Sequence, residues 1–236
     1  MIQLNKIYNE NCLDTMARMP DNFVDLVVTS PPYNLGAKHH TGNNTFSAYD
    51  LYVDDMDEND YQDWQIKVLN EIYRVLKPNG SLLYNHKNRI KNGVQISPYE
   101  WIFRSNLIIK QELTWFNRSQ NFDKCRFYPM TERIYWLSKT KDTDFFNEIG
   151  QNDLIKDTAE GTDKEHKRAF PVQLCRRFIL CFPNSKLVYD PFMGSGTTAV
   201  ASIKEGRNYI GSELSSEYVK IAEKRIADCI SQPTLF

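Results

Sequence analysis

Short apolar runs that end in turn residues alternate along this chain with segments whose apolar positions recur every three or four residues. The first pattern predicts buried β-strands and the second predicts helices. The predicted strands cover residues 6–8, 24–29, 81–84, 107–116, 133–138, 186–189 and 208–211. The predicted helices cover residues 14–19, 59–76, 171–182 and 215–230. A further helix is predicted to start at Ser97, and another to end at Glu205. This alternation favours an α/β fold, with a mostly parallel twisted sheet, helices on both faces and ligands at the carboxyl ends of the strands.

Two stretches lack a clear period. Residues 35–58 come directly after the Ser-Pro-Pro-Tyr-Asn turn at 30–34, a candidate functional motif, and predict a long mobile loop, which suits a lid or a segment that grips substrate. Residues 117–165 combine aromatic, cationic and polar positions and predict a small inserted recognition region, although a hairpin with a polar loop explains part of this stretch equally well. At 236 residues the chain fits a single catalytic domain, 1–236, that contains this insertion.

The net charge of –1 argues neither for nor against a nucleic-acid partner, but the distribution of charge is uneven. Residues 50–63 contain seven acids and no base, whereas residues 85–141 contain eleven Lys or Arg and four acids. The basic stretch is typical of a local phosphate-binding face, and a solvated loop accounts for it as well. The candidate DNA-binding residues are Lys87, Arg89, Arg118, Lys124 and Arg126.

Other features narrow the class of protein. No run of 18 or more apolar residues is present, so a membrane span is not expected, and the first residues lack the layout of a signal peptide. The five cysteines are odd in number and widely spaced, without a C-x-x-C pair or a zinc-ligand spacing. We therefore expect reduced thiols, a cytoplasmic location and no metal.

A first motif, Val28-Thr29-Ser30-Pro31-Pro32-Tyr33, ends the strand 24–29 in two prolines. Proline fixes its own φ, pushes the preceding residue into extended geometry and has no N–H. A hydroxyl, carbonyl oxygens and an aromatic ring are thereby held close together. This set suits a flat base with an exocyclic amine, because the oxygens accept from the amine and the Tyr33 ring stacks on the base. A strand-ending turn with a surface tyrosine is the alternative.

A second motif, Asp190-Pro191-Phe192-Met193-Gly194-Ser195-Gly196-Thr197-Thr198, lies between a predicted strand and a predicted helix. Its glycines allow backbone to approach a cofactor closely. Glu213 ends the next strand, where an acid commonly accepts from ribose hydroxyls. Together these features indicate an adenosine-type cofactor. The alternative is a structural glycine turn with Glu213 as a helix-entry acid.

The two motifs, in this order, resemble the β group of DNA amino-methyltransferases, in which the catalytic motif precedes the cofactor motif and the recognition region lies between them. The resemblance covers residues 9–33, 76–82, 131–139 and 166–226. It implies a Rossmann-like methyltransferase fold with a permuted motif order, and S-adenosylmethionine as cofactor. The implied contacts of its methionine part are Asp190, Pro191, Phe192, Gly194, Gly196 and Thr197.

The resemblance also implies that Glu213 holds the ribose and that Phe170 contacts the cofactor. Where the family often has Gly-Asp-Cys, this chain has Glu10-Asn11-Cys12. Asn11 therefore takes the place of the aspartate and is the candidate contact for adenine. The catalytic residues it implies are Ser30, Pro31, Pro32 and Tyr33, which act by positioning the amine and by electrostatics.

The Thr-Ser-Pro-Pro-Tyr form resembles that of cytosine-N4 enzymes, so cytosine-N4 methylation is favoured and adenine-N6 methylation is the alternative. Methylation of RNA or protein amines is less favoured, and an oxidoreductase would leave the Ser-Pro-Pro-Tyr motif without a task. Carbon-5 methylation needs a cysteine nucleophile, and the Pro-Cys pair of that family is absent.

The expected partner is double-stranded DNA, with a cognate restriction endonuclease and a homodimer as further hypotheses. The tail Gln232-Pro233-Thr234-Leu235-Phe236 resembles peptides that dock in the groove of sliding clamps. A frayed terminus is the simpler interpretation of this tail.

Overall fold

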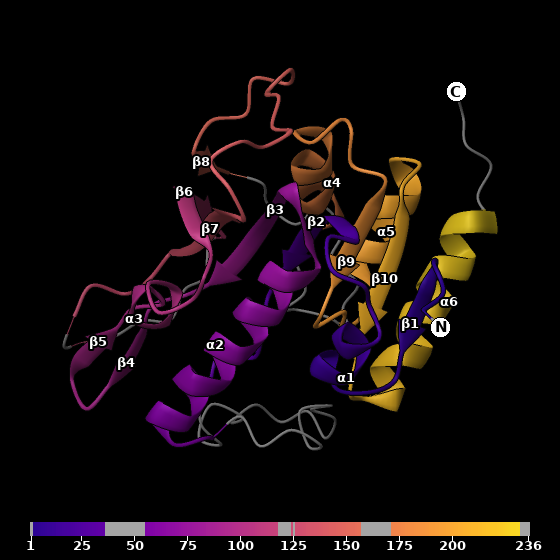
Figure 1. The fold of residues 1–236 in the computed structure, drawn as a ribbon. Coiled ribbons are helices and arrows are strands. Elements are labelled where there is room, and N and C mark those ends of the chain that lie inside the picture. Colours follow the sequence, from indigo (N-terminus) through magenta and orange to yellow (C-terminus); the bar gives the residue numbers. More distant parts are fainter. Residues whose placement is uncertain (1, 36–54, 118–123, 125, 157–170, 232–236) are drawn as a thin grey trace.

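The computed structural model describes residues 2–35, 55–117, 124, 126–156 and 171–231. Eight strands of the described chain form one sheet (Figure 1). Their order is β1 (Lys6–Tyr8), β10 (Asn208–Ser212), β9 (Leu187–Asp190), β2 (Val24–Thr29), β3 (Leu76–His86), β7 (Thr131–Ser138), β6 (Ile108–Phe116) and β8 (Leu154–Ile155). All neighbouring pairs are parallel except those of β7, which is antiparallel to both β3 and β6.

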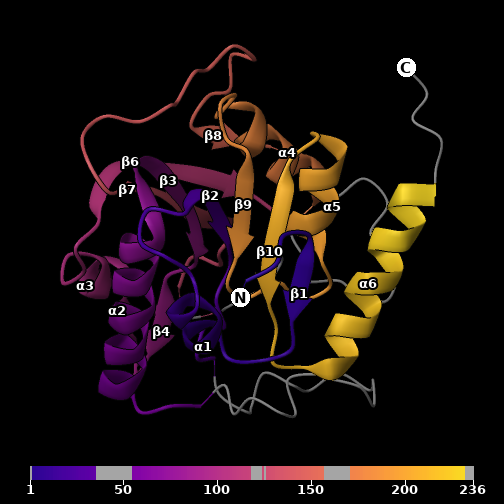
Figure 2. The same ribbon diagram turned by 45° about the vertical axis from the view of Figure 1, so that its right-hand side comes forward.

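Helices cover both faces of the sheet (Figures 1 and 2). On one face lie α1 (Cys12–Ala17), α2 (Glu58–Val75) and α3 (Tyr99–Ile102). On the other lie α4 (Val172–Leu180), α5 (Thr197–Lys204) and α6 (Ser216–Ser231). The predicted α/β fold is thus confirmed.

The central strand β2 shows why this sequence forms a doubly covered sheet. Its side chains alternate between faces, as the pleat of a strand requires. Val27 packs in the core beneath α1 and α2, while Leu26 and Val28 pack in the core beneath α4. Because both faces are buried, the strand is a continuous apolar run rather than an alternating one.

The structure changes some predicted boundaries. β1 and β2 have the predicted bounds, but β3 begins directly after α2, at Leu76, and continues to His86. A hairpin, β4 (Arg89–Lys91) and β5 (Val94–Ile96), was not predicted. Its turn residues Asn92 and Gly93 both have positive φ, 51° and 78°, which matches the Asn-Gly signal for a two-residue hairpin turn.

The two unpatterned stretches are described only in part. Of the predicted loop 35–58, residues 36–54 lie outside the described residues, and α2 already begins at Glu58. The range 117–165 includes β7 and β8, which belong to the central sheet. A role of this range in recognition stays a prediction. None of the helices in the described ranges combines the length and apolar character needed to cross a membrane.

Candidate active site

The two sequence motifs meet at one edge of the sheet. β2 and β9 are parallel neighbours, with Leu26 opposite Val188 and Val27 opposite Tyr189. Their carboxyl ends therefore deliver both motifs to the same place, where open α/β sheets bind ligands. Thr29 Oγ1 donates a hydrogen bond to Asp190 Oδ1 at 2.7 Å, which joins the residue before Ser30 to the start of the glycine motif.

Asp190 anchors this junction. It is buried, and its carboxylate also accepts from Thr198 Oγ1 at 2.7 Å and from the Phe192 backbone N–H at 3.0 Å. Burial raises the pKa of Asp190 to about 6, although these hydrogen bonds act to lower it. Since both oxygens are occupied by protein donors, Asp190 holds the two motifs in register.

The two glycines of the second motif have different surroundings. Gly196 has φ +84°, and a Cβ there would lie 2.8 Å from the Ala222 Cβ of α6. Gly194 has φ +52°, and a Cβ there would meet nothing nearer than Phe192 O at 3.9 Å. Gly196 thus permits close helix packing, whereas Gly194 presents open backbone. Thr197 starts α5 and is buried, as is Pro191.

Glu213 follows β10, the strand beside β9, so a third strand end reaches the same edge. Its Oε2 accepts from the Gly194 N–H and its Oε1 from the Ser215 N–H, each at 2.8 Å. Burial raises the pKa of Glu213, and these backbone hydrogen bonds offset part of the effect. A carboxylate has further lone pairs, so a ribose hydroxyl is still able to donate to it.

Asn11, Phe170 and Phe192 were also predicted to contact the cofactor. Asn11 follows β1, whose carboxyl end lies at the same edge because β1 is parallel to β10. Asn11 is the N-cap of α1, where its Oδ1 accepts from the Leu13 N–H at 2.9 Å. Its contact with adenine stays a prediction. Phe170 lies outside the described residues. Phe192 is half-buried, with its ring 5.6 Å from that of Trp64 on α2.

The first motif ends in a polar cluster. Ser30 Oγ and Tyr33 Oη are hydrogen-bonded at 2.7 Å, and Tyr33 Oη donates to Glu132 Oε2 at 3.2 Å. Asn85 Nδ2 donates to the same Glu132 oxygen at 2.8 Å and also to Tyr33 Oη. Glu132 Oε1 accepts from Asn117 Nδ2 at 2.9 Å. The ends of β2, β3 and β6 and the beginning of β7 thus converge on two motif residues.

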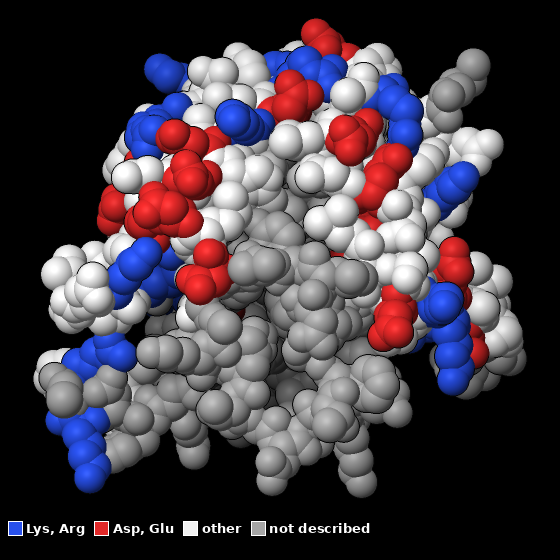
Figure 3. All heavy atoms as spheres, turned by 90° about the horizontal axis from the view of Figure 1, so that it is seen from below, with Lys and Arg blue, Asp and Glu red and all other residues white. Residues whose placement is uncertain are grey.

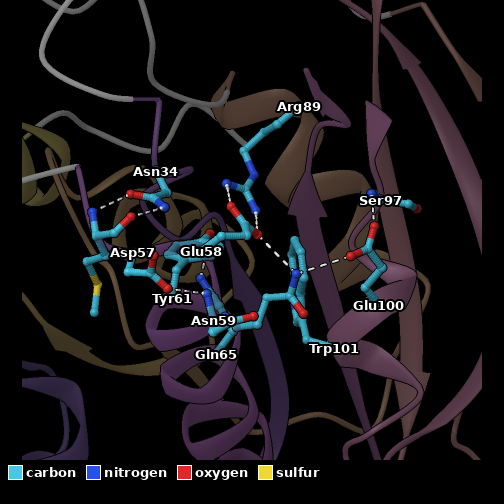
Figure 4. A network of polar contacts seen from close by, with 12 residues as sticks. Asn34, Asp57, Glu58, Asn59, Tyr61, Gln65, Arg89, Ser97, Glu100 and Trp101 are labelled. Atoms are coloured by element: carbon cyan, nitrogen blue, oxygen red, sulfur yellow. Dashed lines mark hydrogen bonds and ion pairs between the residues drawn. The ribbon is translucent and has the colours of Figure 1, made fainter. Parts of the chain in front are cut away.

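A buried network supports the motif from behind, and Figure 4 labels two of its members, Tyr61 and Gln65. Tyr61 Oη of α2 lies 2.7 Å from the carbonyl oxygen of Pro32 and 2.7 Å from His86 Nε2. Gln65 Nε2 donates to Tyr61 Oη at 2.8 Å. Burial lowers the pKa of His86 to about 3, so its ring is neutral at physiological pH. The Pro32 carbonyl is consequently held by α2.

Asn34 joins the end of the motif to the beginning of α2 (Figure 4). It has φ +55°, its Oδ1 accepts from the Met56 N–H at 2.7 Å and its Nδ2 donates to the Met56 carbonyl at 3.0 Å. Asp57 then caps α2 by accepting from the Asn59 N–H at 2.9 Å. The helix that supports Pro32 is therefore fixed to the motif at two points.

One predicted DNA contact is corrected. Arg89 is buried, with Nη1 and Nη2 2.8 Å and 2.7 Å from the two carboxylate oxygens of Glu58 (Figure 4). Its guanidinium also lies 4.6 Å from the ring centre of Tyr61 and 5.6 Å from that of Trp101. A side chain enclosed in this way is not available to a phosphate.

For the other basic candidates, a contact with DNA stays a prediction. Lys87 is half-buried, with Nζ 5.5 Å from the ring centre of Tyr33, while Lys124 and Arg126 are exposed and Arg118 lies outside the described residues. Figure 3 views the face to which the parallel strands' carboxyl ends point, and there the described acidic and basic side chains are interspersed around undescribed atoms.

Sequence reasoning missed several residues of the site. Glu132 and Asn85 belong to no motif, and only the topology of β3 and β7 brings them to Tyr33. Tyr61 also lies outside both motifs, yet it is fully buried and contacts the Pro32 carbonyl. Thr29 and Thr198 stand within the two motifs, but nothing in the sequence assigns a task to their hydroxyls.

Comparisons with known proteins agree with this geometry. The profile of the DNA methylase family, N6_N4_Mtase, matches residues 24–224. The type II methyltransferase M.BglII of Bacillus subtilis is 28% identical over 93% of this chain and 68% of its own length. The type II methyltransferase M2.MboI of Moraxella bovis is 29% identical over 93% of this chain and 86% of its own.

Solved structures share the fold. PvuII DNA methyltransferase (cytosine-N4-specific) has a TM-score of 0.75 and 22% identity, over 97% of this chain and 92% of its own. The putative DNA modification methylase TTHA0409 of Thermus thermophilus, solved with S-adenosyl-L-methionine, has a TM-score of 0.71 and 20% identity, over 96% and 95%. The family match covers most of the chain and the site's motifs lie within it, so this chain belongs to the N6/N4 DNA methylase family and is a DNA methyltransferase.

Proposed function

We propose that this chain is a β-group enzyme that transfers a methyl group from S-adenosylmethionine to an exocyclic amine of a base in double-stranded DNA. Cytosine N4 is the favoured acceptor and adenine N6 is the alternative. The observation that carries the proposal is the Thr29–Asp190 hydrogen bond, which sets the Ser30–Tyr33 motif beside the glycine motif.

The residues around Gly194 fit the cofactor. The open side of Gly194 allows a ligand to approach the backbone, and Glu213 lies at the next strand end with a buried carboxylate. When bound, S-adenosylmethionine supplies an electrophilic methyl group. Gly194 and Glu213 would hold it, and the solved complex of TTHA0409, a protein of this fold, contains the same cofactor.

Ser30 and Tyr33 would prepare the acceptor amine. The lone pair of such an amine is delocalised into the base, so an oxygen that accepts its N–H helps to localise the lone pair and aim it. The base must leave the duplex stack, at a cost of a few kcal/mol. Stacking on an aromatic ring such as that of Tyr33 returns about 1–3 kcal/mol.

The preference for cytosine rests on the Thr-Ser-Pro-Pro-Tyr form of the motif. A structural neighbour, the PvuII enzyme, is named as cytosine-N4-specific, and it supports the same choice. Adenine remains the alternative because both amines need the same acceptor oxygens. The restriction endonuclease partner, the homodimer, the clamp-binding tail and the cytoplasmic location stay predictions, and residues 232–236 lie outside the described chain.

The test is to incubate the protein with labelled S-adenosylmethionine and duplex DNA of mixed sequence, digest the DNA, and identify the methylated nucleoside by mass spectrometry. We expect N4-methylcytosine, abolished in Ser30→Ala and retained in Ser231→Ala at the end of α6. N6-methyladenine as the sole product would overturn the cytosine preference. Parallel incubations contain RNA or protein in place of DNA, and label there but not in DNA would overturn the proposed substrate.

A further inference from the structure

Three elements bring polar side chains together beside Ser30. β3 and β7 are antiparallel, and Asn85 lies opposite Ile134. The beginning of β7 therefore lies where β3 ends, at the edge that carries Ser30 and Tyr33. Glu132 enters from β7, and its Oε2 accepts from both Tyr33 Oη and Asn85 Nδ2.

The hydrogen bonds of this cluster have a direction. A carboxylate only accepts, so the Tyr33 hydroxyl proton points to Glu132. Asn85 Nδ2 donates to Tyr33 Oη, and this oxygen also lies 2.7 Å from Ser30 Oγ. Because the Tyr33 proton is already committed, Ser30 donates to Tyr33.

The direction of the Ser30–Tyr33 hydrogen bond determines whether Ser30 Oγ donates to a substrate or accepts from it. Its proton is used by Tyr33, and Asn85 Nδ2 approaches one lone pair at 3.4 Å. A second lone pair is left for a base N–H. Glu132 thus makes Ser30 an acceptor, although a serine hydroxyl in isolation is both donor and acceptor.

We propose that Glu132 is the terminal proton acceptor of methyl transfer, acting through Tyr33 and Ser30; this rests on the proposed function. As the nitrogen–methyl bond forms, the methyl–sulfur bond breaks and its electron pair stays on sulfur. The nitrogen becomes cationic and gives a proton to Ser30 Oγ. Ser30 passes its own proton to Tyr33, and Tyr33 passes its proton to Glu132. The products are a neutral methylated amine and a protonated Glu132, which later loses the proton to solvent.

Glu132 also has structural contacts, so the test must separate the two roles. Glu132 Oε1 accepts from Asn117 on the β6 side of the cluster. A purely structural Glu132 would affect folding and DNA or cofactor affinity. A relay instead predicts that Glu132 and Tyr33 act as one unit on the rate of transfer. The effects on the rate of substituting residues that act as a unit are strongly non-additive.

The experiment measures single-turnover methyl transfer at saturating cofactor and DNA for Glu132→Gln, Tyr33→Phe and the double variant. Phenylalanine keeps the stacking ring and removes only the hydroxyl. General acid–base catalysis contributes about 10²–10⁴-fold, so we expect each single variant to be about 10²-fold slower or more. The double variant should be no slower than the slower single variant, and the solvent deuterium isotope effect of the wild type should fall in Glu132→Gln.

Glu112→Gln is the matched control. Glu112 lies on β6, accepts from Tyr99 Oη at 2.7 Å and pairs with Arg133 at 3.0 Å, outside the proton path. Its rate should stay within about threefold of the wild type, whereas the loss in the relay variants should exceed the general acid–base minimum of about 10²-fold. Dissociation constants of cofactor and DNA, measured directly, should not change in Glu132→Gln.

The outcomes separate this inference from the proposed function. A Glu132→Gln enzyme that transfers methyl at the wild-type rate, or a double variant whose losses multiply, overturns the relay while the wild type still methylates an amine. If the wild type methylates no base amine, the proposed function itself fails. A loss explained entirely by weaker binding assigns Glu132 a structural role and also overturns the relay.

Discussion

Gly194 and Gly196 share one turn and both have positive φ, but a methyl group would meet different neighbours at each. At Gly196 it would collide with Ala222 of α6, and at Gly194 it would occupy the open side of the turn. We expect Gly196→Ala to lower the free energy of unfolding by roughly 2–5 kcal/mol, because backbone strain and overpacking both contribute. Gly194→Ala should cost only the backbone strain, about 1–2 kcal/mol, but should weaken cofactor binding.

Urea denaturation and calorimetric titration with S-adenosylmethionine measure these two effects separately. A Gly194→Ala protein with unchanged cofactor affinity would show that the open side of the turn does not face the ligand. Gly206, which has φ +65° and nothing near its Cβ position, supplies the control for backbone strain alone.

Asp190 links stability to pH. Its pKa is about 6 in the folded chain, above the ordinary value of 3.8, because burial disfavours the charged form. As pH rises through this window, the unfolded chain releases the proton first, so the stability that protonated Asp190 contributes is lost by about pH 6. The loss is at most about 3 kcal/mol. Asp190→Asn should therefore gain stability relative to the wild type as pH rises from about 4 to about 7.

Urea denaturation of both proteins at several pH values gives the difference directly. Parallel stability curves over this range would contradict the assignment. The Asp190→Asn chain should also transfer methyl more slowly, since its amide must donate at one of the three positions where the carboxylate accepts.

At the residue scale, the sequence motifs predicted which of their own residues lie at the site, but not which residues elsewhere in the chain contact them. Ser30, Tyr33, Gly194 and Glu213 reach one edge as predicted because each stands at the end of a strand or in the turn after it. Glu132 was not predicted, because its neighbours come from strands that are distant in sequence. The positive charge of Arg89 suggested a phosphate contact only because the sequence does not show Glu58 beside it.

At the scale of elements, α2 depends on the Arg89–Glu58 pair. The two side chains are 5% and 19% exposed. Burial raises the pKa of Glu58, but the hydrogen bonds from Arg89 and Gln62 and the positive charge of Arg89 together bring it below its ordinary value. Removing one member of a largely buried pair costs about 3 kcal/mol, because the other charge is left without its partner. We expect Arg89→Met to show a loss of this size in urea denaturation.

The exposed pair Arg104–Asp63, with side chains 52% and 57% exposed, is the matched control. Exposed pairs contribute little, so Arg104→Met should cost less than about 1 kcal/mol. The double variant Arg89→Met with Glu58→Gln should recover part of the loss. Equal costs for the two arginines would contradict the structural role of the buried pair.

The strands and helices with strong patterns were predicted, and those with weak local signals were not. β2 has its predicted bounds because its run of apolar residues is buried on both faces. The hairpin β4–β5 was not predicted, since its strands are short and largely exposed and the signal was confined to Asn92-Gly93. β8 is only two residues long, and its pairing with β6 comes from tertiary structure.

At the scale of the whole molecule, the face beside Tyr33 should meet the phosphates of DNA. Lys87 lies over the Tyr33 ring, whereas Arg89 is enclosed by Glu58. Removing one cation that neutralises a phosphate reduces the slope of log affinity against log salt by about 0.9 for duplex DNA. We expect Lys87→Ala to reduce the slope by about this amount and Arg89→Met to leave it unchanged.

Fluorescence anisotropy with a labelled duplex at several salt concentrations measures the slope. Lys186→Ala is the control, because Lys186 precedes β9 and lies at the opposite end of the sheet from the motifs. A slope that falls for Lys186 but not for Lys87 would place the DNA on another face.

The antiparallel direction of β7 couples two distant parts of the sequence. A strand that runs against its neighbour brings its first residues next to the neighbour's last ones, so Asn85 and Glu132, 47 residues apart in sequence, are hydrogen-bonded. Because side chains alternate between the two faces of a strand, a shift of one residue in the β3–β7 register would turn one of these two side chains away from Tyr33. The acceptor end of the cluster therefore depends on the pairing of two strands as well as on the motif itself.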